Sequence, residues 1–348
     1  MISRRHLSVA AAISLIAGAT VAPAPALAGD SYTFAGAVYG MAAAPDNSLL
    51  IADSGAGVVE LKHGTGRLAV PLPGVNDAEP LGRDAMYAVT SGENGFVGKL
   101  YRAGRDGTAT AVADLSAYEA SVNPDGADIN ANPFGVQPLP GGGGALVTDA
   151  GANALLRVEE SGAIDWIATF PPQDVSSAPA KELAGCPNPP ANLAFVCALP
   201  AVMPAQAVPT SVVIGPDGAY YVGELKGSPA EPGTSRIWRV DPRARHARCG
   251  TSKDCRVVAD GFSAIVDLTV GPGGTLTVVE MEENGFLAAA LGLAKRGGTV
   301  NTCRFDKWTC RAVATGLPVP IAAAVTRGRT VALVDALTPA SARVVEVS

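Results

Sequence analysis

Short apolar runs, each bounded by glycine, proline or aspartate, recur along most of this chain. Residues 208–261 hold four of them, rich in valine, isoleucine and tyrosine. Such runs predict strands joined by tight turns. Between the first two runs, Pro216, Asp217 and Gly218 supply a fixed φ, a side-chain acceptor and a position for positive φ, which predicts a hairpin. The segment is therefore expected to form a four-stranded antiparallel sheet.

The same order of runs returns before and after this segment. Four-stranded repeats of this period are typical of a β-propeller, because one such sheet cannot bury both of its faces alone. The sequence predicts an all-β fold, a six-bladed β-propeller with four-stranded antiparallel blades. The other copies lie at residues 38–72, 77–114, 133–168, 262–316 and 320–347.

The last copy contains only three runs. Residues 31–34, which precede the first copy, form a short run with no other place in the pattern. We expect this N-terminal strand to close the ring as the outermost strand of the last blade, since that would remove an open sheet edge.

The first 28 residues have the pattern of a removable export signal. Arg4 and Arg5 precede an apolar run over residues 9–21, and an Ala-Leu-Ala cleavage site follows. The paired arginines resemble a twin-arginine signal, and an ordinary secretory signal is the alternative. We expect 1–28 to be removed and 29–348 to form a single propeller domain that is secreted, periplasmic or in the cell envelope.

Composition and charge limit the partners of the mature chain. The 348 residues are 48% hydrophobic and 17% charged, enough to bury a large core. Cleavage after Ala28 would change the net charge from −6 to −8, which argues against nucleic acid and anionic membrane surfaces. No later apolar run reaches the roughly 18 residues of a transmembrane segment. We expect a monomer.

All six cysteines lie in the mature chain, as three pairs close in sequence. An even number in an exported protein predicts disulfides. A structural zinc site built from four of the thiols is the alternative, although the spacings are not the usual two residues. The expected disulfides join Cys186 with Cys197, Cys249 with Cys255, and Cys303 with Cys310.

Three long insertions are expected on one face of the ring, at residues 116–132, 171–207 and 281–297. Loops of this length inside a compact domain are usually functional or disordered. The Pro-rich insertion at 171–207, clipped by a disulfide, is either a lid or a tolerated surface excursion. This face is the candidate site.

Five predicted second strands end in an acid, and all five ends reach that face. They could ring the channel mouth and bind a cation or an amine, or they could accept hydrogen bonds from nearby backbone N–H groups. Asp267, at the start of a first strand, could point into the channel or accept bonds between blades. The acids are Asp53, Asp149, Glu224, Glu280 and Asp335; the candidate ligand-binding residues are Asn132, Asp149, Glu224, Asp267 and Glu280.

Asp128, Asn130 and Asn132 have the alternate spacing of loops that bind hard cations such as Ca²⁺. The distal bidentate acid of an EF-hand is missing, and Pro133 follows at once. These three residues are candidate metal ligands, with turn-forming hydrogen bonds as the alternative.

The sequence lacks the residues that several kinds of catalysis need. Only three histidines exist, one of them in the signal, so a histidine-based triad is hard to assemble. The chain has no phosphate loop or dinucleotide fingerprint. Acid or base catalysis by Glu224, Glu280 or Asp267 is still conceivable.

Six segments together resemble the ScyD/ScyE family of exported proteins, named from the scytonemin pigment cluster. The resemblance implies a six-bladed propeller related to NHL-repeat proteins and implies little about activity. The clipped insertion and the cysteine pairs depart from the family, so a pigment role is not carried over. The segments are residues 113–119, 123–126, 132–135, 203–211, 222–229 and 260–267.

Two functional interpretations follow. The first is a non-catalytic binding or assembly module that recognises a small molecule, a glycan or a protein through its insertion-bearing face. The alternative is a metal-dependent hydrolase of the lactonase or gluconolactonase kind, with Ca²⁺ at the channel mouth. The first strand of blade one offers that hydrolase no acidic ligand.

Overall fold

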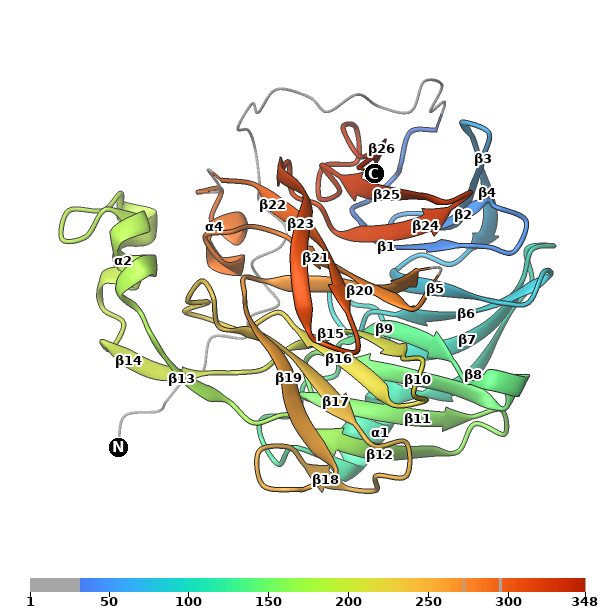
Figure 1. The fold of residues 1–348 in the computed structure, drawn as a ribbon, viewed down its shortest axis with the longest axis horizontal. Coiled ribbons are helices and arrows are strands. Elements are labelled where there is room, and N and C mark those ends of the chain that lie inside the picture. The colour runs from blue at the N-terminus through green and yellow to red at the C-terminus, as the bar shows by residue number, and fades with distance from the viewer. Residues whose placement is uncertain (1–31, 272, 294–295, 348) are drawn as a thin grey trace.

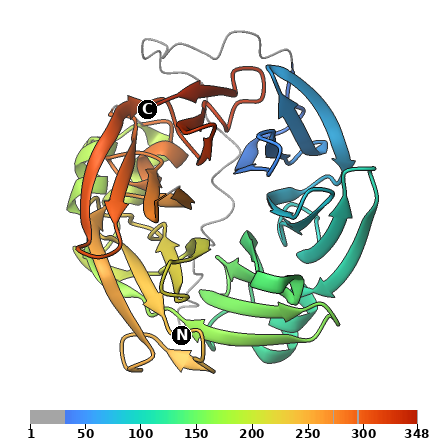
Figure 2. The ribbon, with the colours of Figure 1, turned by 45° about the vertical axis from the view of Figure 1, so that its right-hand side comes forward.

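A computed structural model describes residues 32–271, 273–293 and 296–347. Six small antiparallel sheets stand around a common axis, each forming one blade of the ring (Figure 2). The predicted six-bladed β-propeller is confirmed. The predicted signal, 1–28, lies outside the described residues.

Each blade begins at the axis and adds its later strands outward. Blade one contains β1 (Val38–Ala43), β2 (Leu49–Asp53), β3 (Gly57–Lys62) and β4 (Thr65–Pro71). Blade two contains β5 (Val75–Leu81), β6 (Ala85–Thr90), β7 (Lys99–Gly104) and β8 (Ala109–Asp114). Blade three contains β9 (Pro133–Pro138), β10 (Gly144–Asp149), β11 (Ala154–Glu159) and β12 (Ile164–Thr169).

The second half of the ring follows the same plan. Blade four contains β15 (Pro209–Ile214), β16 (Tyr220–Glu224), β17 (Ser235–Val240) and β19 (Cys255–Phe262). Blade five contains β20 (Ile265–Gly271), β21 (Thr275–Glu280), β22 (Gly298–Arg304) and β23 (Thr309–Leu317). Blade six contains β24 (Ala322–Thr326), β25 (Arg329–Val334) and β26 (Arg343–Glu346).

The remaining elements lie in connections between these strands. Helix α1 (Leu115–Val122) follows blade two, the 3-10 helix η2 (Pro140–Gly142) lies in a hairpin of blade three, and the short strand β18 (Ala247–Arg248) lies in a hairpin of blade four. The second insertion holds β13 (Gln173–Ser176), α2 (Ala178–Ala184), η3 (Ala191–Leu193), α3 (Ala194–Cys197) and β14 (Val202–Ala205). Helix α4 (Phe286–Ala290) lies in the third insertion. Figure 1 shows α2, β13, β14 and α4 together on one side of the ring.

The second strand of each blade has apolar residues on both faces because blades cover it from both sides. All five residues of β2 are buried. Leu50 and Ala52 pack towards blade two, whereas Leu49 and Ile51 pack in the core shared with blade six. Alternate residues of a strand face opposite ways, so one apolar run serves two interfaces.

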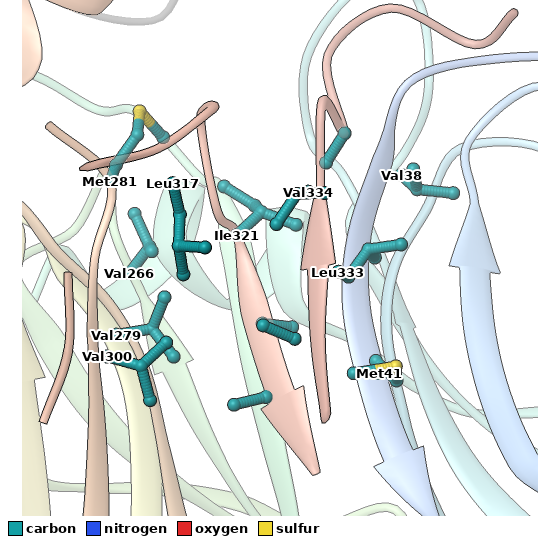
Figure 3. Packing of buried hydrophobic residues seen from close by; sticks show 14 of the residues in the cluster. Val38, Met41, Val266, Val279, Met281, Val300, Leu317, Ile321, Leu333 and Val334 are labelled. Carbon is teal, nitrogen blue, oxygen red and sulfur yellow. The ribbon is translucent and has the colours of Figure 1, made fainter. Parts of the chain in front are cut away.

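The hydrophobic core is therefore divided among the interfaces between blades. Separate clusters fill the interfaces of blades one and two, two and three, three and four, and four and five. A larger cluster joins blades five, six and one. Figure 3 shows part of it, with Val266, Met281, Leu317 and Ile321 packed between blades five and six.

Blade six has three strands, and the expected fourth strand at 31–34 is not found in the described part of the chain. Residues 32–34 form no strand, and Ser31 lies outside the described residues. Tyr32 packs on Gly66 of β4 instead, and Phe34 is buried in the core that contains Val345. Their side chains, rather than a backbone ladder, fill the space between blades one and six.

The ring closes through its inner strands. The N–H of Val38 in β1 donates to the carbonyl of Ala336, just after β25, at 2.8 Å. Strands β1 and β24 are adjacent at the axis. The circle therefore closes without the predicted strand exchange.

Blade three gains a fifth strand from its neighbour. In the long hairpin of blade four, β18 pairs in parallel with β12. His246 stacks on Trp166 at 4.5 Å between ring centroids, and its Nε2 lies 2.7 Å from Oδ1 of Asp165. This hairpin therefore ties blade four to blade three.

All three expected disulfides are present. Cys303 and Cys310 are direct partners across β22 and β23, so this bridge joins the two strands of one hairpin. Cys249 follows β18 and Cys255 begins β19, so that bridge closes the hairpin that crosses to blade three. Within the described residues, no helix is both long and apolar enough to cross a membrane.

Candidate functional site

The inner strands of five blades share an irregularity at the same position. In blade one Val38 pairs with Asp53 and Gly40 with Ala52, which leaves Tyr39 between them unpaired. A bulge of this kind turns a side chain away from its regular direction. The bulged residues are Tyr39, Asn76, Phe134, Thr210 and Val266.

Four of the bulged residues line one cavity of about 400 Å³ at the axis: Tyr39, Phe134, Thr210 and Val266. Blade six adds Ile321, which immediately precedes β24. The rings of Tyr39 and Phe134 meet edge to face, with centroids 6.0 Å apart and an angle of 62°. The inner ends of the blades thus form a largely apolar floor.

The three insertions supply the walls of this cavity. Ile129 comes from the first, Phe195 and Leu199 from the second, and Phe286 from the third. Ile129 is 61% exposed and Phe195 is 44% exposed, although both are large and apolar. Exposed apolar side chains around a concave site are typical of ligand-binding surfaces.

The second and third insertions hold each other in place. Ala180 and Ala184 of α2 form a small core with Leu193 and Val196, and Leu287 and Leu291 pack against it. The disulfide between Cys186 and Cys197 lies in the same segment. The wall that carries Phe195 is therefore anchored both by packing and by a covalent bond.

The polar part of the cavity is concentrated on one side. Oδ1 of Asn132 accepts hydrogen bonds from Oγ of Ser91 at 3.3 Å and Nδ2 of Asn76 at 3.5 Å. Glu93 also lines the cavity, and its buried Oε1 has no hydrogen-bond partner. Burial, and then the nearby charge of Asp149, raise the pKa of Glu93.

Among the predicted site residues, Asp128, Asn130 and Asn132 all line the cavity. Asp128 is exposed and the other two are half-buried. The described residues contain no group of three or more His, Cys, Asp or Glu arranged to hold a metal ion.

Asp149 lies behind Asn132, fully buried outside the cavity lining. Its Oδ1 accepts the backbone N–H groups of Asn132, Gly151 and Ala152 at 2.7 to 3.1 Å. Burial raises the pKa of Asp149 to about 6 against the lowering effect of these hydrogen bonds. Asp53 accepts backbone N–H groups in the same way in blade one.

Glu224 is also buried behind the cavity, where three side chains donate to it. Nζ of Lys226 lies at 2.7 Å, Nε of Arg236 at 2.5 Å and Nε1 of Trp238 at 3.0 Å. Both Glu224 and Lys226 side chains are 1% exposed.

Glu280, at the equivalent position of blade five, accepts bonds from the N–H of Ser263 at 2.5 Å and Nδ2 of Asn301 at 2.6 Å. Burial raises its pKa. Asp149, Glu224 and Glu280 therefore bond to their own blades and to neighbouring loops.

Asp267 joins blades through its hydrogen bonds. Its Oδ2 accepts the N–H of Ala323 in blade six at 2.9 Å, and its Oδ1 lies 3.3 Å from Oγ of Ser211 in blade four. Asp77 makes the equivalent bond from blade two to the N–H of Val136 in blade three, at 2.9 Å. Burial raises the pKa of Asp267 to about 6 and that of Asp77 to about 7.

A second cavity of about 620 Å³ lies at the opposite end of the channel, among the hairpins. Glu79 lines it, and burial, followed by the charges of Asp77 and Asp267, raises the pKa of Glu79 well above its ordinary value. Three carboxyl groups thus influence one another within the channel.

Sequence reasoning missed the floor residues and Glu93. A sequence pattern marks these positions at the start of five inner strands. The strand opens with an apolar residue or proline, the bulged residue follows, and a small or acidic residue comes third, as in Val38-Tyr39-Gly40 and Pro133-Phe134-Gly135. The small third residue lets the strands approach closely. A Cβ atom on Gly135, for example, would lie 2.6 Å from the carbonyl oxygen of Thr210.

Several solved propeller structures are similar to this chain in fold at low sequence identity. A protein of unknown function from Bacteroides thetaiotaomicron has a TM-score of 0.57 at 11% identity, over 92% of this chain and 71% of the other. The PQQ-bound aldose sugar dehydrogenase of Streptomyces coelicolor has a TM-score of 0.53 at 12% identity, over 93% and 97%.

The calcium-binding protein regucalcin of Agrobacterium tumefaciens gives 0.52 at 12% identity, over 89% and 85%. Identities this low establish the shared fold alone. No profile of a known protein family matches the sequence, and no curated protein matches it.

Proposed function

We propose that this protein is an exported, non-catalytic binding module that holds a small, largely apolar molecule in the cavity at the axis. The observation that carries the proposal is convergence: inner-strand residues of four blades, Ile321 just before the inner strand of blade six, and side chains of all three insertions line the same 400 Å³ space. Small-molecule sites are typically concave, mostly apolar and furnished with a few polar groups that fix orientation.

The predicted residues divide into two roles under this proposal. Asp128, Asn130 and Asn132 lie on the cavity wall and are assigned to ligand contact. Asp149, Glu224, Asp267 and Glu280 are assigned to support, because each already bonds to groups of the protein.

Binding of 2-phenylethanol, a soluble neutral aromatic probe, tests the proposal. For a probe of this size we expect a Kd on the order of 1 mM by calorimetry. Phe134→Ala removes part of the floor and should weaken binding, whereas Val270→Ala, at the other end of the channel, should not. Absence of binding by the wild-type protein would contradict the proposed function.

The metal-dependent hydrolase is the second candidate, and its acids would be the neighbouring channel carboxylates Asp77, Glu79 and Asp267. Against it, Asp77 and Asp267 already accept N–H groups from the next blades. Stoichiometric calcium in the purified protein, with lactone hydrolysis lost in Asp267→Asn, would establish the hydrolase and overturn the non-catalytic proposal.

We also propose the export route and the family relationship on the grounds given by the sequence. The three disulfides favour an oxidising compartment. Sequencing of the exported protein should find Gly29 at its N-terminus, after removal of 1–28 and ahead of a single propeller domain. Membership of the ScyD/ScyE family rests on the six segments and carries no activity with it.

A further inference from the structure

The charges around the axial cavity are of one sign. Among its described lining residues are two carboxylates, Glu93 and Asp128, and no lysine, arginine or histidine. Lys226 directly follows the lining residue Leu225, but it does not line the cavity. Its ammonium group is buried and bound to Glu224. Carboxylates on low-dielectric walls produce a potential that attracts cations and repels anions.

Glu93 has an unused acceptor at this site. Its loop is fixed by its own backbone: its N–H donates to Oγ of Ser91 at 3.0 Å, and its carbonyl accepts the N–H of Phe96 at 3.0 Å. Oε1 nevertheless lies buried without a hydrogen-bond partner. A buried carboxylate oxygen left unpaired is costly, and a charged donor on a ligand would satisfy it.

The aromatic floor lies beside this carboxylate. Glu93, Tyr39 and Phe134 line both the main cavity and a smaller one of about 80 Å³ next to it. Burial, followed by the charge of Glu93, raises the pKa of the Tyr39 hydroxyl, which agrees with their proximity. Tyr39 and Phe134 meet edge to face, so two aromatic rings lie next to the carboxylate. Aromatic rings attract organic cations through their faces.

We propose that the ligand of this cavity is an organic cation, an amine or quaternary ammonium compound with an apolar body. Its charged group binds between the carboxylate of Glu93 and the rings of Tyr39 and Phe134. Its apolar body lies against Val266, Ile321 and the insertion walls. This inference rests on the proposed function and adds the chemical class of the ligand.

Three soluble probes of similar shape separate charge from apolar contact: 2-phenylethylamine, 2-phenylethanol and phenylacetate. Calorimetry with the full mature protein at neutral pH should show the amine binding about tenfold more tightly than the alcohol, and phenylacetate most weakly. Added salt should weaken binding of the amine and leave binding of the alcohol unchanged.

Glu93→Gln should remove the preference for the amine, measured as the ratio of the dissociation constants of 2-phenylethanol and 2-phenylethylamine. Glu159→Gln is the matched control, with the same change of charge on an exposed residue at the opposite face. Tyr39→Leu is a second variant that should reduce the preference without changing any charge. Thermal unfolding verifies that each variant is folded.

The outcomes separate this inference from the function beneath it. Equal affinities for the three probes, or an amine preference that survives both Glu93→Gln and Tyr39→Leu, would overturn the organic-cation assignment while the binding function stands. Failure of all three probes to bind the wild-type protein would overturn both.

Discussion

The ammonium nitrogen of Lys226 lies 2.7 Å from Oε1 of Glu224, although each side chain is only 1% exposed. Burial lowers the pKa of Lys226, and the charge of Glu224 opposes that effect. Lys226 also has a φ of 70°, unusual for a residue with a side chain. The pair therefore fixes the loop from which Leu225 and Ser228 reach the axial cavity.

Glu224→Gln should lower the free energy of unfolding by about 3 to 5 kcal/mol, because it leaves the Lys226 ammonium buried without an opposite charge of its own. Combining Glu224→Gln with Lys226→Met should recover much of that loss, since the fully buried ammonium is then gone and only Arg236, whose side chain is 18% exposed, keeps its charge. Urea unfolding of both single variants and the double variant measures the coupling. Equal, additive losses would contradict this account.

Two substitutions of Asp267 should have different effects on the free energy of unfolding. Asp267→Ala removes the acceptor of the Ala323 N–H and should cost about 1 to 3 kcal/mol. Asp267→Asn keeps an oxygen acceptor but removes a carboxyl group whose pKa is raised to about 6. It should therefore leave the free energy of unfolding at pH 8 unchanged or raise it slightly. Chemical unfolding at pH 8 measures both. A larger loss in Asp267→Asn than in Asp267→Ala would contradict the interblade role.

Glu119 should make the protein less stable as pH rises. It is 2% exposed, and its carboxylate oxygens make no hydrogen bond of regular geometry. Burial, with the charges of Asp149 and Asp125, outweighs the lowering effect of the Asn130 N–H and raises the pKa of Glu119 from 4.5 to about 7. The unfolded chain therefore releases this proton at lower pH than the folded protein does. The contribution of Glu119 to the free energy of unfolding should therefore fall between about pH 4.5 and 7 and stay constant above pH 7.

Glu119→Gln should remove this contribution and raise the free energy of unfolding by about 1 to 3 kcal/mol at pH 8, with little effect at pH 4. Melting temperatures from pH 4 to pH 8 give the slope, and Glu159→Gln is the exposed control. A variant whose slope matches that of the wild type would show that Glu119 ionises freely in the folded state.

The disulfide between Cys186 and Cys197 should matter for the wall of the cavity more than for the ring. Replacing both cysteines with serine removes at most about 3 kcal/mol of loop constraint, and that constraint lies within the second insertion. We expect little change in the main thermal transition and weaker binding of 2-phenylethanol, because Phe195 and Leu199 lie in or next to the clipped loop. Loss of the main transition would show that the insertion belongs to the core instead.

Strand content, blade number and cysteine pairing could be read from the sequence because each depends on short apolar runs and the turns that bound them. The continuous apolar run of β2 and the direct pairing of Cys303 with Cys310 are such cases. The cavity could not be found this way, since a bulge shifts Tyr39 and Phe134 out of the period on which the reading relied. The strand expected at 31–34 failed because Tyr32 and Phe34 stabilise the ring through packing of their side chains.

Strand β18 of blade four pairs with β12 of blade three, so the six interfaces between blades should not be equally strong. To part those two blades, the chain must break the β12–β18 ladder and unstack His246 from Trp166 while Cys249 and Cys255 hold the hairpin shut. No strand ladder crosses any of the other five interfaces between blades in the described residues. Under load or heat, the interface between blades three and four should therefore be the last to open.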